Sequence, residues 1–140
     1  MKHLLRLSML VLFTLNMSAQ NDKQLAMNTS SSGVFTFENE VIDYGTINQN
    51  TDGNRVFKFK NTGNQPIIIS KIKSSCGCTV ASKPSKPIMP GETSEINIKY
   101  DTKRIGAFSK TITITSNANQ PIKQLKIKGK IVKEDFVSSK

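Results

Sequence analysis

Two stretches decide the fold of this chain: Ser94–Tyr100, which reads SEINIKY, and Phe108–Thr115, which reads FSKTITIT. Apolar and polar side chains alternate along both. A period of two places the apolar side chains on one face, as in a β-strand that packs on a core with one side and meets water with the other. The two stretches therefore predict strands of an antiparallel sheet. Their inward side chains are expected to be Ile96, Ile98, Tyr100, Phe108, Ile112 and Ile114.

Weaker versions of this signal extend in both directions along the chain. We expect further strands at 34–37, 41–47, 55–60, 66–73 and 125–131, where β-branched and aromatic residues dominate. Segment 66–73 differs from the others, because its isoleucines at positions 67, 68 and 69 follow one another without interruption. Such a continuous apolar run is typical of a central strand that is covered on both faces.

Turn-forming residues separate these segments. The sequences TDGN at 51–54, NTGN at 61–64, PGE at 90–92 and SNAN at 116–119 are rich in the residues that favour chain reversal. About seven short strands at this spacing predict an all-β fold, a single antiparallel β-sandwich of immunoglobulin type. The Cys–Trp–Cys pin of antibody domains is absent, since the chain has no Trp, so we expect Phe and Ile to fill the core. No segment has the apolar spacing of an amphipathic helix.

The N-terminal residues resemble an export signal. In residues 1–20, Lys2 and Arg6 precede a short apolar run and small residues follow it, which is the layout of a secretory signal peptide. Residues 21–33 are polar and Ser-rich and predict a flexible tether. We expect the sandwich at 34–133, a C-terminal tail at 134–140, and no transmembrane segment in the mature chain. The protein is therefore expected to be exported, either to the periplasm or as a secreted protein.

Charge and composition narrow the class of function. The 140 residues hold 20 Lys and Arg against 10 Asp and Glu, a net charge of +10, which becomes 18 − 10 = +8 once Lys2 and Arg6 are removed. The only histidine, His3, would leave with the signal, so a Ser or Cys nucleophile would lack its usual base. The acids occur singly or in solvated groups, and no phosphate-binding Gly-rich loop is present. We predict that the protein is not an enzyme and has no catalytic residues.

Cys76 and Cys78 are the only reactive pair. At i and i+2 on an extended segment both side chains point to one side, and Gly77 between them leaves three interpretations open. The pair can pack the end of the sandwich as small buried groups, or close a strained disulfide that is readily reduced. It can also offer two thiolates to Cu(I), with Met89 as a third ligand. Packing is favoured over the disulfide and the disulfide over metal, so no cofactor is predicted.

Most of the positive charge lies late in the chain. From Lys99 to Lys133 there are nine Lys or Arg residues and one acid, and Lys126, Lys128 and Lys130 form a ridge on the outward face of the last expected strand. This candidate interaction face can attract anionic envelope lipid or polysaccharide. The favoured interpretation is that the lysines discourage edge-to-edge pairing of sheets. Nucleic acid is not expected as a partner, because Lys outnumbers Arg by 17 to 3 and no aromatic residues interleave the ridge.

Several motifs together resemble a known family. They are the strand and N-x-G turn FKFKNTG at 57–63, SCGCT at 75–79, IMPGE at 88–92, Gly106 before Phe108, and LKIKG at 125–129. In this order they resemble the bacterial family catalogued as domain of unknown function 1573, over roughly residues 36–132. That family is related to the immunoglobulin-like modules of ciliary and spindle proteins and, more distantly, to periplasmic pilus chaperones. The resemblance implies a seven-stranded sandwich in an extracytoplasmic setting and implies no assigned activity.

These observations favour a non-catalytic, exported immunoglobulin-like interaction module. Its partner would be an envelope protein or polymer, bound at a sheet edge by strand addition or through the lysine ridge. The alternative is a thiol-redox or Cu(I)-binding envelope protein that acts through Cys76 and Cys78. A pilus-chaperone-like role is weaker, because only one sandwich is expected. The sequence leaves the oligomeric state open.

Overall fold

A computed structural model describes residues 31–133 of the chain. The expected signal peptide (1–20), residues 21–30 of the expected tether and the C-terminal tail lie outside the described residues. Within them, all regular secondary structure is β-strand, and no helix is long and apolar enough to cross a membrane. The strands are β1 (Phe35–Phe37), β2 (Val41–Asn48), β3 (Asn54–Asn61), β4 (Ile69–Ser74), β5 (Thr79–Ser82), β6 (Thr93–Tyr100), β7 (Gly106–Ser116) and β8 (Ile122–Val132).

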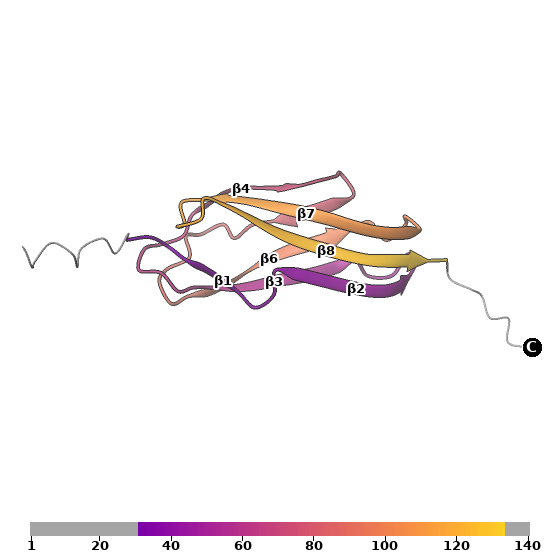
Figure 1. The fold of residues 1–140 in the computed structure, drawn as a ribbon, viewed down its shortest axis with the longest axis horizontal. Coiled ribbons are helices and arrows are strands. Elements are labelled where there is room, and N and C mark those ends of the chain that lie inside the picture. Colours follow the sequence, from indigo (N-terminus) through magenta and orange to yellow (C-terminus); the bar gives the residue numbers. More distant parts are fainter. Residues whose placement is uncertain (1–30, 134–140) are drawn as a thin grey trace, which may run out of the picture. The chain divides into compact units, whose positions relative to one another are not determined.

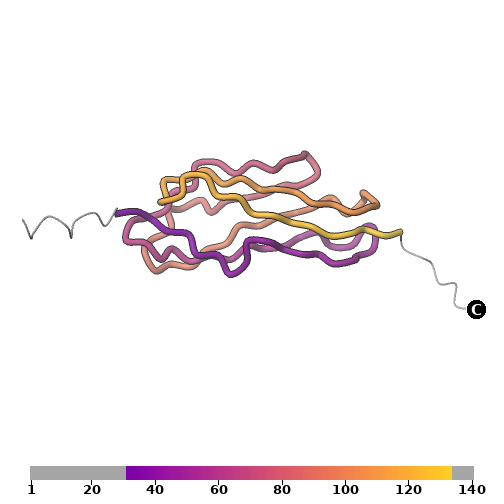
Figure 2. Tube along the Cα trace, in the orientation of Figure 1, coloured from indigo at the N-terminus to yellow at the C-terminus, as the bar shows by residue number. Residues whose placement is uncertain are grey.

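The strands form two four-stranded sheets that face each other (Figures 1 and 2). The order is β1-β3-β6-β5 in the first sheet and β2-β8-β7-β4 in the second. The expected all-β sandwich is therefore confirmed, but the expectation of purely antiparallel pairing is wrong, because β2 pairs with β8 in parallel. The chain passes from the first sheet to the second between β1 and β2 without reversing its direction (Figure 1). In the second sheet β2 therefore runs in the same direction as its neighbour β8. Alternation in a sequence does not report the direction of pairing.

The expected central strand at 66–73 is an edge strand instead. In the structure β4 pairs only with β7 and ends the second sheet. Ile67 and Ile69 are buried, whereas Ile68 between them is 52% exposed. The run of isoleucines leads into β4. Ile67, just before β4, forms an isolated β-bridge with Ile88, which lies between β5 and β6. Apolar continuity therefore did not indicate burial on both faces here.

The structure has one strand, β5, that the sequence did not predict, which makes eight strands in residues 31–133 rather than about seven. This strand has four residues and lies at the edge of the first sheet, paired with β6. Its apolar pattern is reversed at Val80, which is 65% exposed, and Ala81 faces the core instead. A strand this short with its larger side chain in solvent carries no usable alternation.

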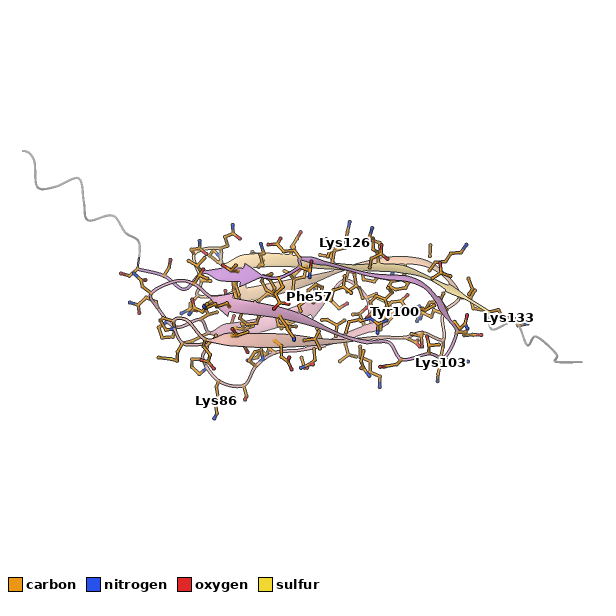
Figure 3. All side chains as sticks on the ribbon, turned by 90° about the horizontal axis from the view of Figure 1, so that it is seen from below. Phe57, Lys86, Tyr100, Lys103, Lys126 and Lys133 are labelled. Atoms are coloured by element: carbon orange, nitrogen blue, oxygen red, sulfur yellow. A yellow bond between two sulfur atoms is a disulfide. The ribbon has the colours of Figure 1, made fainter. Side chains whose placement is uncertain are left out.

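Phe and Ile fill the core, as expected. Two aromatic clusters take the place of the disulfide and tryptophan that lie in the core of antibody domains. Phe35, Phe37 and Phe59 form one cluster, with ring centroids 5.2–5.5 Å apart. In the other, Tyr100 stacks on Phe108 at 3.9 Å and Tyr44 meets Phe108 edge-on. Figure 3 shows Phe57 and Tyr100 between the sheets.

Gly129 allows the second aromatic cluster to close. It pairs with Phe108 across β7 and β8. A Cβ at this position would lie 2.8 Å from the Cβ of Tyr44 and 3.0 Å from the Phe108 ring. The Tyr44 hydroxyl in the cluster donates to the Gly53 carbonyl at 2.8 Å, so its burial leaves no polar atom without a partner.

One buried polar side chain, Asn61, joins several segments at the end of β3. Its side-chain NH₂ donates to the carbonyls of Gln65 (2.8 Å) and Ile88 (2.9 Å). Its side-chain oxygen accepts from the backbone N–H groups of Val34 (3.2 Å) and Gly63 (3.0 Å). Asn61 is fully buried, so these four bonds replace all the hydrogen bonds that water would make. The N-x-G motif is thus a structural junction as well as a turn.

Packing begins before Val34, the expected start of the sandwich. Gly33 is buried, and its carbonyl accepts from the Asn119 N–H at 2.9 Å. The Ser32 carbonyl accepts from the Asn64 N–H at 3.1 Å. The last residues of the expected 21–33 tether are therefore held against the sandwich.

Candidate functional site

The cysteine pair lies in the connection between the two sheets. Cys76 and Cys78 form a disulfide with their Cα atoms 5.3 Å apart. They lie in the turn between β4 and β5, not on the extended segment expected from the sequence. Because β4 and β5 are each the last strand of a sheet, this turn closes one open edge of the sandwich. The Asp101 N–H donates to the Cys78 carbonyl at 2.9 Å and fixes the turn to the end of β6.

The two sulfurs have different surroundings. Cys78 is 6% exposed and belongs to the core, whereas Cys76 is only partly buried at its edge. The Thr79 hydroxyl lies 3.9 Å from the Cys76 Sγ and 4.0 Å from the Cys78 Sγ. A Cβ added at Gly77 would meet no atom within 4 Å, so the outer side of the turn is open. A thiolate from solvent would therefore reach Cys76 more easily than Cys78.

The structure does not supply the third Cu(I) ligand that the sequence suggested. The Gly91 N–H donates to the Asn61 carbonyl just before β6 begins, whereas Cys78 is bonded just after β6 ends. Met89 and the disulfide therefore lie at opposite ends of an eight-residue strand. Within residues 31–133, no group of three or more His, Cys, Asp or Glu side chains could hold a metal ion.

The lysine ridge lies on the second sheet, and its strand is not an edge. Lys126, Lys128 and Lys130 are exposed, while Leu125, Ile127 and Ile131 of the same strand are buried. Figure 3 shows Lys126 pointing away from the sandwich. Because β8 pairs with both β2 and β7, the three lysines have no sheet edge to protect. The interpretation that they discourage edge pairing is therefore wrong.

The structure adds residues that sequence reasoning missed. Lys73 pairs with Thr113 across β4 and β7, and Thr111 pairs with Lys126 across β7 and β8, so all four side chains share the outer face. Lys71 lies on the same face of β4, opposite Thr115. We call this surface the lysine face and define it as Lys71, Lys73, Thr111, Thr113, Lys126, Lys128 and Lys130. The signal for the two β4 lysines is the alternation of Lys71, Ile72 and Lys73. The expectation that 66–73 is covered on both faces left no exposed face for these lysines.

One acid on β2 borders the lysine face. The Asp43 carboxylate lies 3.2 Å from the Lys128 Nζ. The Gly45 N–H bonded to this carboxylate, and then Lys128, hold the pKa of Asp43 below its usual value. Among the described residues, the other four lysines of the face make no salt bridge.

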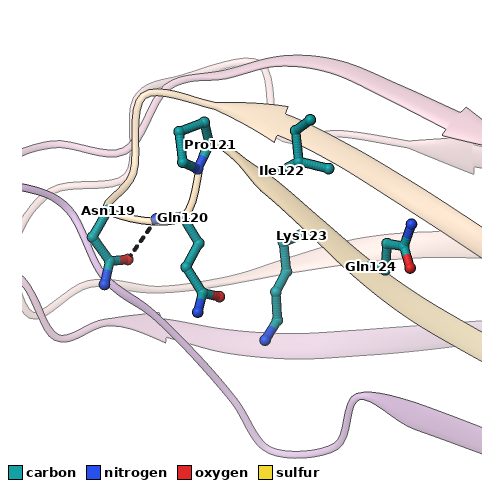
Figure 4. Close-up of a pocket in the computed structure, with 6 residues that line it drawn as sticks. All are labelled: Asn119, Gln120, Pro121, Ile122, Lys123 and Gln124. Carbon is teal, nitrogen blue, oxygen red and sulfur yellow. Dashed lines mark hydrogen bonds between the residues drawn. The ribbon is translucent and has the colours of Figure 1, made fainter.

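Two surface hollows in residues 31–133 are open to solvent. One is lined by six consecutive residues, Asn119–Gln124, in the turn before β8 and the start of that strand (Figure 4). Because no second element closes over it, it is a feature of the surface and not a binding cavity. A smaller hollow lies on the outside of the first sheet, over Val56, Val80 and Asn97.

The family described as "Protein of unknown function (DUF1573)" matches residues 35–131. The chain belongs to this family. The match covers the sandwich from β1 to β8, which confirms the resemblance inferred from the sequence motifs. No curated protein matches the chain.

Solved structures similar to this DUF1573 member share its fold. A protein of unknown function from Porphyromonas gingivalis W83 has a TM-score of 0.65 at 18% identity, over 78% of this chain and 51% of that one. This chain therefore spans about half the length of that relative. PapD-like domain 7 of human CEP192 has a TM-score of 0.62 at 10% identity, over 85% of this chain and 99% of that domain. A complex of a chaperone with a tip adhesion subunit from Acinetobacter baumannii has a TM-score of 0.52 at 12% identity, over 69% of this chain and 56% of that one. At these identities the likeness establishes the PapD-like, immunoglobulin-like fold.

Proposed function

We propose that this protein is a non-catalytic, exported interaction module that binds another envelope component through the lysine face. The observation that carries the proposal is the placement of five lysines on the outside of one sheet, four of them without an acidic partner among the described residues. Charged residues on a protein surface usually belong to mixed patches of both signs. A face of one sign on paired strands attracts and orients an anionic partner.

The fold supports this role. Lys126, Lys128 and Lys130 lie on a strand with a partner on each side, so the backbone that carries them is held in place. A pre-ordered surface binds with a smaller loss of conformational entropy than a flexible loop does. The PapD-like neighbours include a chaperone bound to an adhesion subunit, which is consistent with protein binding by this fold. Export is supported by the sequence of residues 1–20.

Recovery of a partner from the native envelope tests this proposal. The tagged full chain is crosslinked in its own cells and purified, and the bound material is identified by mass spectrometry. The K126Q/K128Q/K130Q variant is expected to lose the specific partner. The matched control K58Q/K60Q/K99Q removes the same charge from exposed positions of the first sheet and is expected to retain it. Equal recovery with both variants, or no specific partner with the wild type, would contradict the proposal.

A second candidate function is thiol–disulfide exchange at the Cys76–Cys78 turn. The disulfide joining the two residues favours it, together with the unequal burial of the sulfurs. A thiolate would attack the Cys76 sulfur, form a mixed disulfide there and release Cys78 as a thiolate. Cu(I) binding requires the two thiolates, and therefore a dithiol that first reduces the disulfide and becomes a disulfide itself.

Trapping the mixed disulfide tests this candidate. Incubation of the Cys78→Ser variant with an aromatic disulfide should label Cys76 rapidly, whereas labelling of Cys78 in the Cys76→Ser variant should be slow. Similar labelling rates in the folded variants would show that the burial difference does not direct the exchange.

A further inference from the structure

The lysine face has an ordered arrangement of charge. Its five lysines face one acid, Asp43 on β2, which leaves a local charge of 5 − 1 = +4. Lys126, Lys128 and Lys130 occupy every second position of one strand, so their Cα atoms repeat at about 6.8 Å. Lys71 and Lys73 stand two strands away, at roughly 10 Å across the sheet. The charges therefore form two columns, and such a regular array suits a linear polymer with repeated negative groups better than one isolated anion.

A strip of hydroxyl groups separates the two lysine columns. Thr111 and Thr113 of β7 lie between Lys73 and Lys126, and both are half-buried among their neighbours. In the described part of the chain, neither side-chain hydroxyl has a hydrogen-bond partner, although the Thr111 N–H is bonded to the Ser75 side chain at 3.2 Å. Each hydroxyl can therefore donate to and accept from a ligand. Groups that both donate and accept are complementary to sugar hydroxyls.

Other anionic partners fit this surface less well. A membrane-binding face usually presents a cluster of large apolar or aromatic side chains for insertion. The exposed apolar neighbours of the lysine face are Val41, beside Lys126, and Ile122, beside Thr115, and they lie singly at its border, four positions apart along β8. A nucleic-acid surface usually presents Arg and aromatic residues, and those are missing from the face. The combination that is present consists of ammonium groups at fixed spacing and free hydroxyls between them.

We propose that the lysine face binds a linear acidic polysaccharide, with its carboxylates on the two lysine columns and its sugar hydroxyls on Thr111 and Thr113. This inference rests on the proposed function, because it names the chemical class of the envelope component. The polymer lies along the sheet, and its carboxylates displace water from the lysines that have no acidic neighbour.

Calorimetric titration of the full chain with hexagalacturonate, an oligomer of uronic acid, tests the inference. Neutral maltohexaose and phosphatidylglycerol vesicles are titrated alongside it. We expect binding of the uronate oligomer that weakens with added salt, and none of maltohexaose. K126Q/K128Q/K130Q should weaken binding at least tenfold, and K58Q/K60Q/K99Q less than threefold. Thr111→Val/Thr113→Val should weaken it about fivefold for a lost hydrogen-bonding contribution of about 1 kcal/mol.

Three results would overturn the inference. They are no binding of hexagalacturonate, equal losses in the two lysine variants, and tighter binding of the vesicles than of the oligosaccharide. If the oligosaccharide fails but the envelope pull-down still yields a partner that depends on Lys126, Lys128 and Lys130, the proposed function stands and the polysaccharide assignment falls. If neither the oligosaccharide nor an envelope partner binds in a way that depends on these lysines, the claim that the lysine face is a binding surface is wrong. Circular dichroism of each variant separates these outcomes from misfolding.

Discussion

Replacement of Asn61 by alanine is expected to destabilise the sandwich by about 3–4 kcal/mol, since each net hydrogen bond contributes about 1 kcal/mol. The substitution removes four side-chain hydrogen bonds at a fully buried site. The Ile88 carbonyl keeps the hydrogen bond that it accepts from the Ile67 N–H, so it loses only one of its two hydrogen bonds. Val34 loses the partner of its N–H just before β1. For a domain whose total stability is typically about 5–15 kcal/mol, this is a large fraction.

Urea denaturation followed by circular dichroism measures this loss. The midpoint should fall while the slope with denaturant stays unchanged, because the same surface is exposed on unfolding. Asn64→Ala, in the same turn but exposed, is the matched control and should cost less than about 0.5 kcal/mol. A loss below about 1 kcal/mol for Asn61→Ala would refute the view that this side chain joins the segments.

Asn61→Asp sharpens the test because it keeps the shape and removes the two donors. The new carboxylate would face the carbonyls of Gln65 and Ile88, which raises the pKa of that carboxyl above its ordinary value. A raised pKa in the folded state stabilises the protein below the unfolded pKa of about 4 and loses that contribution as the pH rises. The variant should therefore be less destabilised at acidic pH than at pH 7. A pH-independent difference from wild type would show that the two carbonyls do not face the side chain.

Three further predictions concern the core and the cysteine turn. Gly129→Ala should cost about 1–3 kcal/mol in urea denaturation, because its Cβ would collide with the aromatic cluster, whereas Gly77→Ala, in open space, should be nearly neutral. Burial raises the pKa of Tyr44 to about 12. The stability that the protonated hydroxyl contributes is therefore complete below about pH 10 and is lost as the pH rises towards 12. Tyr44→Phe should remove this pH-dependent loss of stability, which a pH titration followed by fluorescence measures. Reduction of the Cys76–Cys78 disulfide should lower the thermal midpoint by about 5–10 °C, because the short loop that it closes corresponds to only about 1.5 kcal/mol, and a collapse of the fold on reduction would contradict this.

Sequence reasoning located most strands because their pattern is local. The alternation around Ile96 and Ile112 and the turn at 61–64 each depend on residues that are close in the chain. The parallel pairing of β2 with β8 joins segments about eighty positions apart in sequence, and no local pattern records it. Val80 shows the same limit, because an edge strand with its apolar residue in solvent resembles a loop.

The candidate site was predicted in part for the same reason. The ridge on β8 follows from alternation alone, and the structure places its three lysines in solvent. Lys71 and Lys73 join them only through the register of β4 on β7, which is a tertiary property. The junction at Asn61 was also missed, because a buried asparagine in an N-x-G turn looks like an ordinary turn residue until its distant partners are known.

Site-specific photocrosslinking in living cells tests the central claim most directly. A photoreactive amino acid is placed at Thr113, in the middle of the lysine face, or at Asn97, on the outer side of the first sheet. The account predicts a specific adduct with an envelope component from position 113, weakened when Lys126, Lys128 and Lys130 are replaced by glutamine, and no such adduct from position 97. An adduct that forms only from position 97, or one from position 113 that persists in the lysine variant, would contradict the claim that the protein acts through the lysine face.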